Sequence, residues 1–228
     1  MIKGKKLLKK TPSGIQAARP LSSPEEGRTH LDWNKIFHGE FGLSRTITPM
    51  DILDSWRQFS EKTKREWKRF IGGANDIDTN IVPEDVLAGW TLSRKCNLDA
   101  FGKPHNPVVT GSALQKLLSD NQLFITTSQP FLNRLYRYMK TTSFIVSLFD
   151  RNGYLLQVMQ DDKYVEINRQ YKWYPGALWT EEYGGNNSVG SVIRIKKPLQ
   201  ILGPQHYMQF CHGITTSSAP IFDPEGEL

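Results

Sequence analysis

Apolar residues recur at three- and four-residue spacing between positions 49 and 71, as they do along one face of an α-helix. Thr48 is a favourable N-cap, Pro49 suits the first helical position, and Gly72-Gly73 follows the last apolar residue. The spacing predicts an amphipathic helix that ends at these glycines. Its apolar stripe is expected to form part of a core or of a dimer seam, and it comprises Ile52, Leu53, Trp56, Phe59, Thr63, Trp67, Phe70 and Ile71.

Two further helical regions are predicted before residue 140. One spans residues 83–96, and the segment 97–107 after it is rich in turn-forming residues. The other spans residues 112–139. Pro130 falls inside it and predicts a kink or a break, because proline has no amide hydrogen to donate to the helix.

A change of period after residue 142 predicts strands. Residues 143–150 form a short apolar run, Arg151-Asn152-Gly153 is typical of a hairpin turn, and residues 154–160 return. Helices followed by strands indicate an α+β domain, with the helices packed on one face of an antiparallel sheet. The other predicted elements are strands at 198–202 and 215–223, a short helix at 205–210, and a final strand that is expected to be missing because the sequence stops at Leu228.

Residues 174–190 connect the two halves of this predicted sheet and are unusually rich in turn-forming residues. Pro175-Gly176 predicts a rigid turn, while the glycines and asparagines of residues 184–190 allow close backbone approach and local hydrogen bonds. The pattern predicts a shaped loop that leads into a short helix. Either this loop only ties down a long connection, or it closes over a ligand.

The charge of the 228-residue chain is uneven. Its formal net charge is +6, and the first ten residues contain Lys3, Lys5, Lys6, Lys9 and Lys10. Such a run can bind phosphates or an anionic membrane surface, but a solvated tail is the favoured interpretation. We therefore interpret residues 1–47 as a basic, largely disordered tail, with a docking segment around Trp33, Ile36, Phe37 and Phe41.

Targeting and cysteine patterns place the chain in the cytoplasm. No stretch is apolar for long enough to span a bilayer, and the first residues lack the apolar core of a signal peptide. Cys96 and Cys211 lie far apart without a CxxC pattern, which argues against a disulfide framework and a zinc site. Cys211 is expected to be a buried structural thiol.

Nothing in the sequence predicts catalysis. The carboxylates of Asp161-Asp162, Glu181-Glu182 and Asp223 have no partner at catalytic spacing, so we interpret them as exposed loop charges. The sequence also lacks a phosphate-binding loop, a dinucleotide fingerprint and a histidine pair at metal spacing. The chain is therefore predicted not to be an enzyme, with no catalytic residue, metal or cofactor.

Aromatic and polar residues of the second half do indicate a binding site. Large rings beside a few hydrogen-bonding side chains are typical of an apolar small-molecule pocket. The predicted ligand-binding residues are Trp179, Asn187, His206, Tyr207, Phe210 and Ser217.

Short motifs follow one another in a characteristic order from residue 83 onward. They are Gly89-Trp90, Ser93-Arg94, Leu98-Asp99, Pro130, Leu135-Tyr136, residues 148–153, 175–181, 185–190 and 198–203, Gln205-His206-Tyr207, and residues 219–224. In this order they resemble the amino-terminal sensory region of bacterial sigma-54-dependent transcriptional activators of the acetoin-regulator type, which carries a GAF domain.

The resemblance implies a GAF-like sensory domain at residues 83–228, truncated at its C-terminal end. Residues 1 to about 80 lie outside the resemblance, and the helical period alone predicts an amphipathic helix and linker at residues 48–82. It implies a small-molecule effector, a homodimer, and a signal passed through helices to an ATPase module and a helix-turn-helix module. DNA and sigma-54 RNA polymerase would be contacted only through those modules, which this sequence does not contain, and no membrane partner is implied.

The sequence departs from the family pattern at three places. Asn186 stands where threonine is usual, Gln205 replaces a glutamate, and Thr216-Ser217 replaces a Cys-Ser pair. The last two changes fall near the predicted pocket, so no family member's effector is carried over.

Two alternatives remain open. The domain could be a dimerisation or docking scaffold without a ligand, whose basic tail binds nucleic acid. It could also be a cysteine-based reductase, since some GAF domains reduce free methionine sulfoxide. The absence of closely spaced cysteines argues against the reductase.

Overall fold

The computed structural model describes residues 49–140 and 143–228, and the fold is given for these residues. The predicted tail at 1–47, its docking segment and the Thr48 cap lie outside them. Within the described ranges, no helix is both long enough and apolar enough to cross a membrane.

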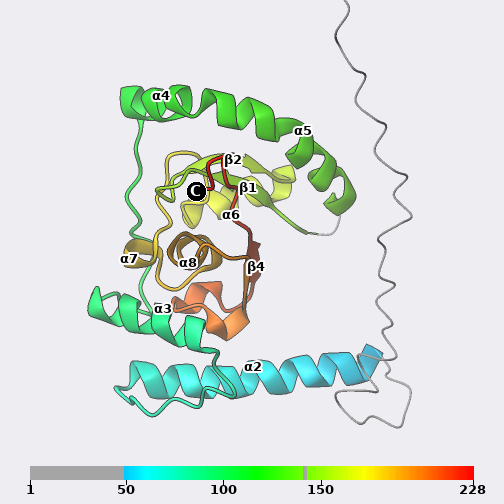
Figure 1. Cartoon of the computed structure of the whole chain (residues 1–228). Coiled ribbons are helices and arrows are strands. Elements are labelled where there is room, and N and C mark those ends of the chain that lie inside the picture. Colours follow the sequence, from blue (N-terminus) through cyan, green and yellow to red (C-terminus); the bar gives the residue numbers. More distant parts are fainter. Residues whose placement is uncertain (1–48, 141–142) are drawn as a thin grey trace, which may run out of the picture. The chain divides into compact units, whose positions relative to one another are not determined.

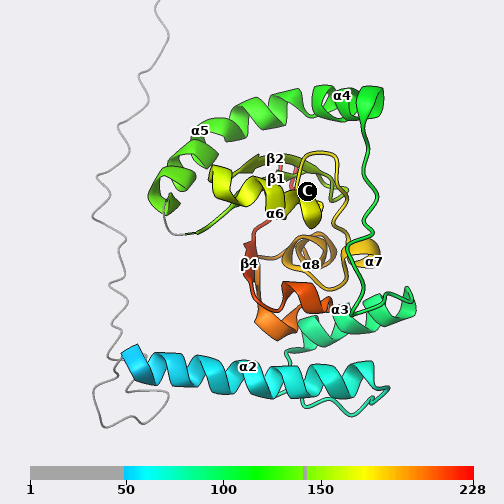
Figure 2. The same ribbon diagram turned by 180° about the vertical axis from the view of Figure 1, so that it is seen from behind.

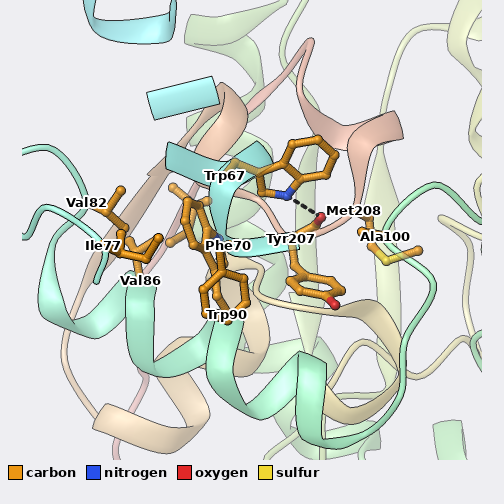
Figure 3. Close-up of a cluster of buried hydrophobic side chains, with 10 residues drawn as sticks. Trp67, Phe70, Ile77, Val82, Val86, Trp90, Ala100, Tyr207 and Met208 are labelled. Atoms are coloured by element: carbon orange, nitrogen blue, oxygen red, sulfur yellow. Dashed lines mark hydrogen bonds between the residues drawn. The ribbon is translucent and has the colours of Figure 1, made fainter. Parts of the chain in front are cut away.

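Helix α2 (Pro49–Ile71) is the predicted amphipathic helix, but only its second half is buried. Trp67 and Phe70 are 0% and 1% exposed, whereas Leu53 and Trp56 are 48% and 41% exposed. The indole nitrogen of Trp67 donates a hydrogen bond to the carbonyl oxygen of Tyr207 at 2.9 Å, as Figure 3 shows. The predicted stripe is thus a core surface at one end and a solvent-exposed surface at the other.

Helix α3 (Glu84–Lys95) joins the same cluster of buried side chains (Figure 3). Trp90 is fully buried against Phe70, and its indole nitrogen donates to the carbonyl oxygen of Gln205 at 2.7 Å. The larger core cluster comprises Trp67, Phe70, Ile77, Val82, Val86, Trp90, Ala100, Ile201, Tyr207 and Met208.

Helices α4 (Gly111–Asp120) and α5 (Gln122–Met139) run over the hairpin of strands β1 and β2, on the side away from α2 and α3 (Figures 1 and 2). Helix α5 continues through Pro130, so a break there is wrong, and the helical region is interrupted at Asn121. Asn121 donates its side-chain amide to the carbonyl oxygen of Leu117 at 2.9 Å and has φ −100° and ψ 10°. A side chain that bonds the backbone in this way competes with the regular helical pattern.

Strands β1 (Val146–Phe149) and β2 (Leu155–Met159) form the predicted hairpin, and β3 (Leu199–Leu202) pairs antiparallel with β4 (Thr215–Ser218). The prediction of one sheet is wrong: the described residues form two separate two-stranded sheets. Helix α8 (Ser188–Ile195) packs against β3 and β4. The α+β class is confirmed.

The short helix predicted at 205–210 is wrong. Two 3₁₀ turns, η2 (Gly203–Gln205) and η3 (Gln209–Cys211), flank an extended segment in its place. His206 has φ −62° and ψ 142° and Met208 has φ −80° and ψ 125°, which are extended backbone conformations that a helix excludes. Strand β4 also ends at Ser218, earlier than predicted, and Pro220 follows it.

The short helical elements between the hairpin and β3 complete the fold. The turn η1 (Asp162–Tyr164) and helix α6 (Val165–Gln170) were not predicted. Helix α7 (Glu181–Gly184) and helix α8 form the end of the connection at 174–190, so the predicted loop leading into a short helix is confirmed.

Candidate functional site

The first part of the connection extends the hairpin by a short strand-like segment. The amide of Gly176 donates to the carbonyl oxygen of Leu155 at 2.8 Å, and the amide of Leu155 donates to the carbonyl oxygen of Ala177 at 2.9 Å. The amide of Trp179 then donates to the carbonyl oxygen of Gly153 at 2.9 Å. These bonds fix where the chain enters α7 and hold Trp179 beside the hairpin.

Trp179 lies at the centre of a second cluster of buried side chains. It is 2% exposed, and its ring packs edge-on against that of Trp173, with 4.7 Å between the centroids. Its indole nitrogen donates to the carbonyl oxygen of Lys172 at 3.1 Å. Phe210, which stacks on Tyr171 at 5.2 Å, packs against both this cluster and the larger one.

Asn187 caps helix α8 and uses its whole side-chain amide in doing so. Its Oδ1 accepts from the amides of Val189 at 3.0 Å and Gly190 at 3.1 Å, and these two amides would otherwise be orphan donors of the first helical turn. Its Nδ2 donates to the carbonyl oxygens of Gly185 at 2.7 Å and Trp179 at 3.2 Å. This asparagine therefore connects Trp179 to the start of α8.

Glu181 is buried, so its interpretation as an exposed loop charge is wrong; Glu182 is exposed, as predicted. The Glu181 carboxylate is 2% exposed and accepts from Arg194 Nε at 2.7 Å and from Ser191 Oγ at 2.8 Å. Arg194 also donates to the carbonyl oxygen of Asp85 at 3.1 Å. Arg194 therefore joins α7, α8 and the start of α3. The hydrogen bond to Glu181 raises the pKa of Arg194.

Asn186 extends this buried network toward α3 and η2. Its backbone amide donates to Ser93 Oγ at 2.9 Å, and its side-chain nitrogen donates to the carbonyl oxygen of Gln205 at 2.8 Å. Its Oδ1 lies 3.0 Å from the hydroxyl of Ser191. A Cβ atom at Gly89 on α3 would overlap Asn186 Oδ1 and lie 2.5 Å from Glu181 Oε1, so only glycine fits there.

His206 is buried as a neutral imidazole. Its Nδ1 lies 2.9 Å from the carbonyl oxygen of Gly203, which can only accept, so Nδ1 carries the hydrogen. Its Nε2 then accepts from the hydroxyl of Thr216 at 2.9 Å. Burial lowers the pKa of His206 to about 4, and it lowers that of His212 to about 4 as well. Both ring nitrogens of His206 are therefore occupied by the chain.

Tyr207 and Ser217 lie in different environments. Tyr207 is 3% exposed within the larger cluster, and its hydroxyl donates to the carbonyl oxygen of Leu98 at 3.2 Å. Ser217 is exposed on β4 and its hydroxyl accepts from Gln200 at 2.8 Å. Of the six residues predicted to bind a ligand, the structure brings together Trp179, Asn187 and Phe210; ligand contact by all six remains a prediction.

Sequence reasoning missed Asn106, which lies beside Trp179 and Asn187. It is 1% exposed, and its Nδ2 donates to the carbonyl oxygen of Leu178 at 2.7 Å. Its Oδ1 is buried and accepts no hydrogen bond from the described residues. A Cβ atom at Gly184 would lie within 3.3 Å of all three side chains, which shows how closely they gather. Asn106 lies in a loop without periodicity, so no local signal identified it.

Cys211 is a buried thiol, as expected, and burial raises its pKa to about 12. At neutral pH such a thiol holds its proton and is a poor nucleophile. Within the described ranges, no group of three or more histidine, cysteine or acidic side chains could hold a metal ion.

Known proteins similar to this chain include transcriptional regulators. The acetoin dehydrogenase operon transcriptional activator AcoR of Bacillus subtilis is 26% identical over 135 residues, which is 59% of this chain and 22% of the relative. A signal-transduction and transcriptional-control protein of Clostridium beijerinckii is 26% identical over 49% of this chain and 18% of the relative. The homologues of this chain are transcriptional activators. The resemblance inferred from the motifs is thereby confirmed.

A third relative is the propane 2-monooxygenase operon transcriptional activator MimR of Mycolicibacterium smegmatis, 26% identical over 42% of this chain and 16% of the relative. The chain thus matches about a fifth of the length of these regulators. No protein-family model matches it. The fold is similar to a solved structure of the Escherichia coli DhaR(N)–DhaL complex, with a TM-score of 0.55 and 16% identity over 63% of this chain and 48% of that one.

Proposed function

We propose that residues 83–228 act as the GAF-type, ligand-sensing regulatory domain of a sigma-54-dependent transcriptional regulator. The relatives support the regulatory part of this proposal. The single observation that supports ligand binding is the buried acceptor Asn106 Oδ1, which accepts nothing from the described residues. Buried polar groups nearly always find a partner, so an unpartnered one suits a ligand donor.

The effector in this proposal is a small polar molecule with a hydroxyl or ammonium group that donates to Asn106 Oδ1. Trp179 and Phe210 supply apolar surface beside it, and Asn187 supplies the connection to α8. The predicted residues His206, Tyr207 and Ser217 would respond through the segment that follows α8. Binding would shift the balance between arrangements of α3 and of the pair α4 and α5, as expected for a sensor.

The remaining partners follow from the same proposal. The regulator acts in the cytoplasm as a homodimer, and DNA and sigma-54 RNA polymerase are contacted by modules outside these 228 residues. No metal or cofactor is needed for the sensing step.

A thermal-shift screen of the purified chain tests ligand binding. The probes are short diols, hydroxyketones, primary amines and organic acids, and a binder raises the unfolding midpoint by mass action. We expect a hit among the hydroxyl- or ammonium-bearing compounds, and we expect Asn106→Leu to abolish its shift.

Asn80→Leu is the matched control, because Asn80 is exposed in a turn beside Asp78. It should retain the full ligand shift. If no probe shifts a well-folded protein, or if the shift survives in Asn106→Leu, the proposed binding site is wrong.

The second candidate is a protein-docking scaffold without a ligand. The solved structure with a similar fold is a complex with a protein partner, DhaL, which favours this alternative at the level of fold. A blank ligand screen together with specific binding of purified DhaL would support it. A cysteine-based reductase is disfavoured by the raised pKa of Cys211.

A further inference from the structure

Helix α5 lies on the hairpin, and α4 leads into it, without burying any residue. Their inward side chains, such as Leu117, Phe124 and Leu132, are only partly buried, and neither helix contains a buried residue. On the opposite face Leu123, Phe131 and Tyr138 are 80%, 73% and 74% exposed. Large apolar side chains repeated along an exposed helix face are typical of an interaction surface.

These residues belong to one regularly spaced row, which we call the outer stripe. Lys116 and Asp120 lie on α4 and the other five members on α5, with the helix break at Asn121 between them. Within each helix the intervals are of three and four residues, which keep side chains on one face. Every member is exposed. The outer stripe comprises Lys116, Asp120, Leu123, Thr127, Phe131, Arg134 and Tyr138.

The spacing of the outer stripe is symmetric about Thr127, because the intervals are 4, 3 and 4 residues on each side. A second copy packed antiparallel, with a twofold axis at Thr127, therefore sets Leu123 against Phe131 of the other copy. It sets Asp120 against Arg134 and Lys116 against the ring of Tyr138. The three contacts are an apolar pair, an ion pair and a cation–π pair.

The parallel arrangement lacks this complementarity, since it opposes Asp120 to Asp120 and Arg134 to Arg134. Within the chain, Asp120 forms only an exposed pair with Lys116, at 2.8 Å, and exposed pairs of this kind are weak. The Asp120 carboxylate is thus available to a second cation.

We propose that two copies of this chain associate antiparallel through the outer stripe, with Thr127 at the twofold axis. The proposal specifies the interface of the homodimer in the proposed function. A single helix pair buries little area, so the dimer is weak and its population depends on concentration.

Sedimentation equilibrium of the full chain tests the charge pairing. Asp120→Arg and Arg134→Asp should each weaken the dimer at least about tenfold by opposing like charges, and the double variant should restore it. Arg137→Asp is the matched control, because Arg137 is exposed on the same helix but outside the outer stripe, and it should leave the dimer unchanged. A chain that is monomeric up to about 200 µM, or a double variant that fails to regain association, overturns the proposal.

Cysteine crosslinking tests the register. In a Cys96→Ser background, Thr127→Cys should form a disulfide between copies, whereas its neighbour Thr126→Cys, which lies off the outer stripe, should not. Equal crosslinking of the two variants overturns the position of the axis. The ligand-induced thermal shift of Arg134→Asp, measured as a monomer, separates this inference from ligand binding: a retained shift leaves the sensor proposal intact.

Discussion

The segment from Glu181 to Val192 and the helix pair α4 and α5 differ in which kinds of side chain they bury and expose. In the first, polar side chains are buried and hydrogen-bonded to one another; in the second, apolar side chains face solvent and none is buried. Buried polar networks are costly to disturb because each member that loses its partner stays desolvated. The specific structure of the first segment therefore depends on a few polar residues, whereas α4 and α5 contribute comparatively little per residue.

The largest loss of stability is expected at Gly89, where the buried polar network of Glu181 and Asn186 leaves no space for a Cβ atom. Gly89→Ala places a methyl group into Asn186 Oδ1 and against the Glu181 carboxylate, so we expect it to lower the free energy of unfolding by about 4 kcal/mol. Urea unfolding measures the change. Gly213→Ala is the control, because nothing lies within 4 Å of a Cβ atom there. A loss of unfolding free energy similar to that of the control would show that α3 is not closely packed against Asn186 and Glu181.

Acidification is expected to cause the next largest loss of stability. The folded pKa of His206 is about 4, below the ordinary value of 6.5, so the unfolded chain binds more protons between these pH values. The stabilisation is complete above pH 6.5 and is lost as the pH falls toward 4, and it amounts to about 3 kcal/mol for this residue. His212 acts in the same direction. Urea unfolding at pH 7, 5.5 and 4.5 should show the fall.

The matched variants for this pH dependence are His206→Gln and His105→Gln. The first removes one titrating group and should make the pH dependence shallower, with the part due to His212 remaining, while the second changes an exposed histidine and should leave it as in the parent chain. An acid loss as steep in His206→Gln as in the parent chain would assign the effect to other groups.

Glu181→Gln should have a moderate effect. It keeps the shape of the side chain but leaves the half-buried Arg194 without its counter-charge, which should cost about 2 kcal/mol. Glu182→Gln alters the neighbouring exposed carboxylate and should cost less than about 0.5 kcal/mol. Chemical unfolding at pH 7 compares the two. Equal costs would mean that the buried ion pair does not hold α7 to α8.

The sequence predicted the elements with strong local signals. The amphipathic period of α2, the Asn-Gly turn of the β1–β2 hairpin and the turn-rich entry to α8 all depend on neighbours in the chain, and the structure contains them. The burial of Glu181 could not be predicted, because its partner Arg194 lies thirteen residues away and no periodic pattern relates the two.

The candidate site was harder to predict than the fold for the same reason. Trp179 and Asn187 were identified from their residue types, but their contact with Asn106 depends on how a loop from residues 97–107 returns beside α7. The separation of the strands into two sheets likewise depends on long-range pairing, which no local strand signal contains. Long-range contacts between irregular segments are what local patterns fail to specify.

The smallest change in the stability of the monomer is expected for substitutions on the outer stripe. Phe131 is 73% exposed, so Phe131→Ser, measured by urea unfolding at low protein concentration, should change the stability of the monomer by less than about 0.5 kcal/mol. Its neighbour Leu132 is partly buried on the inward face, and Leu132→Ser should cost about 2 kcal/mol. A large loss for Phe131→Ser would mean that the outer stripe is covered within one chain, and the contrast between the two regions would then disappear. A small loss, together with weaker self-association, would mean that this face contributes to assembly and not to folding.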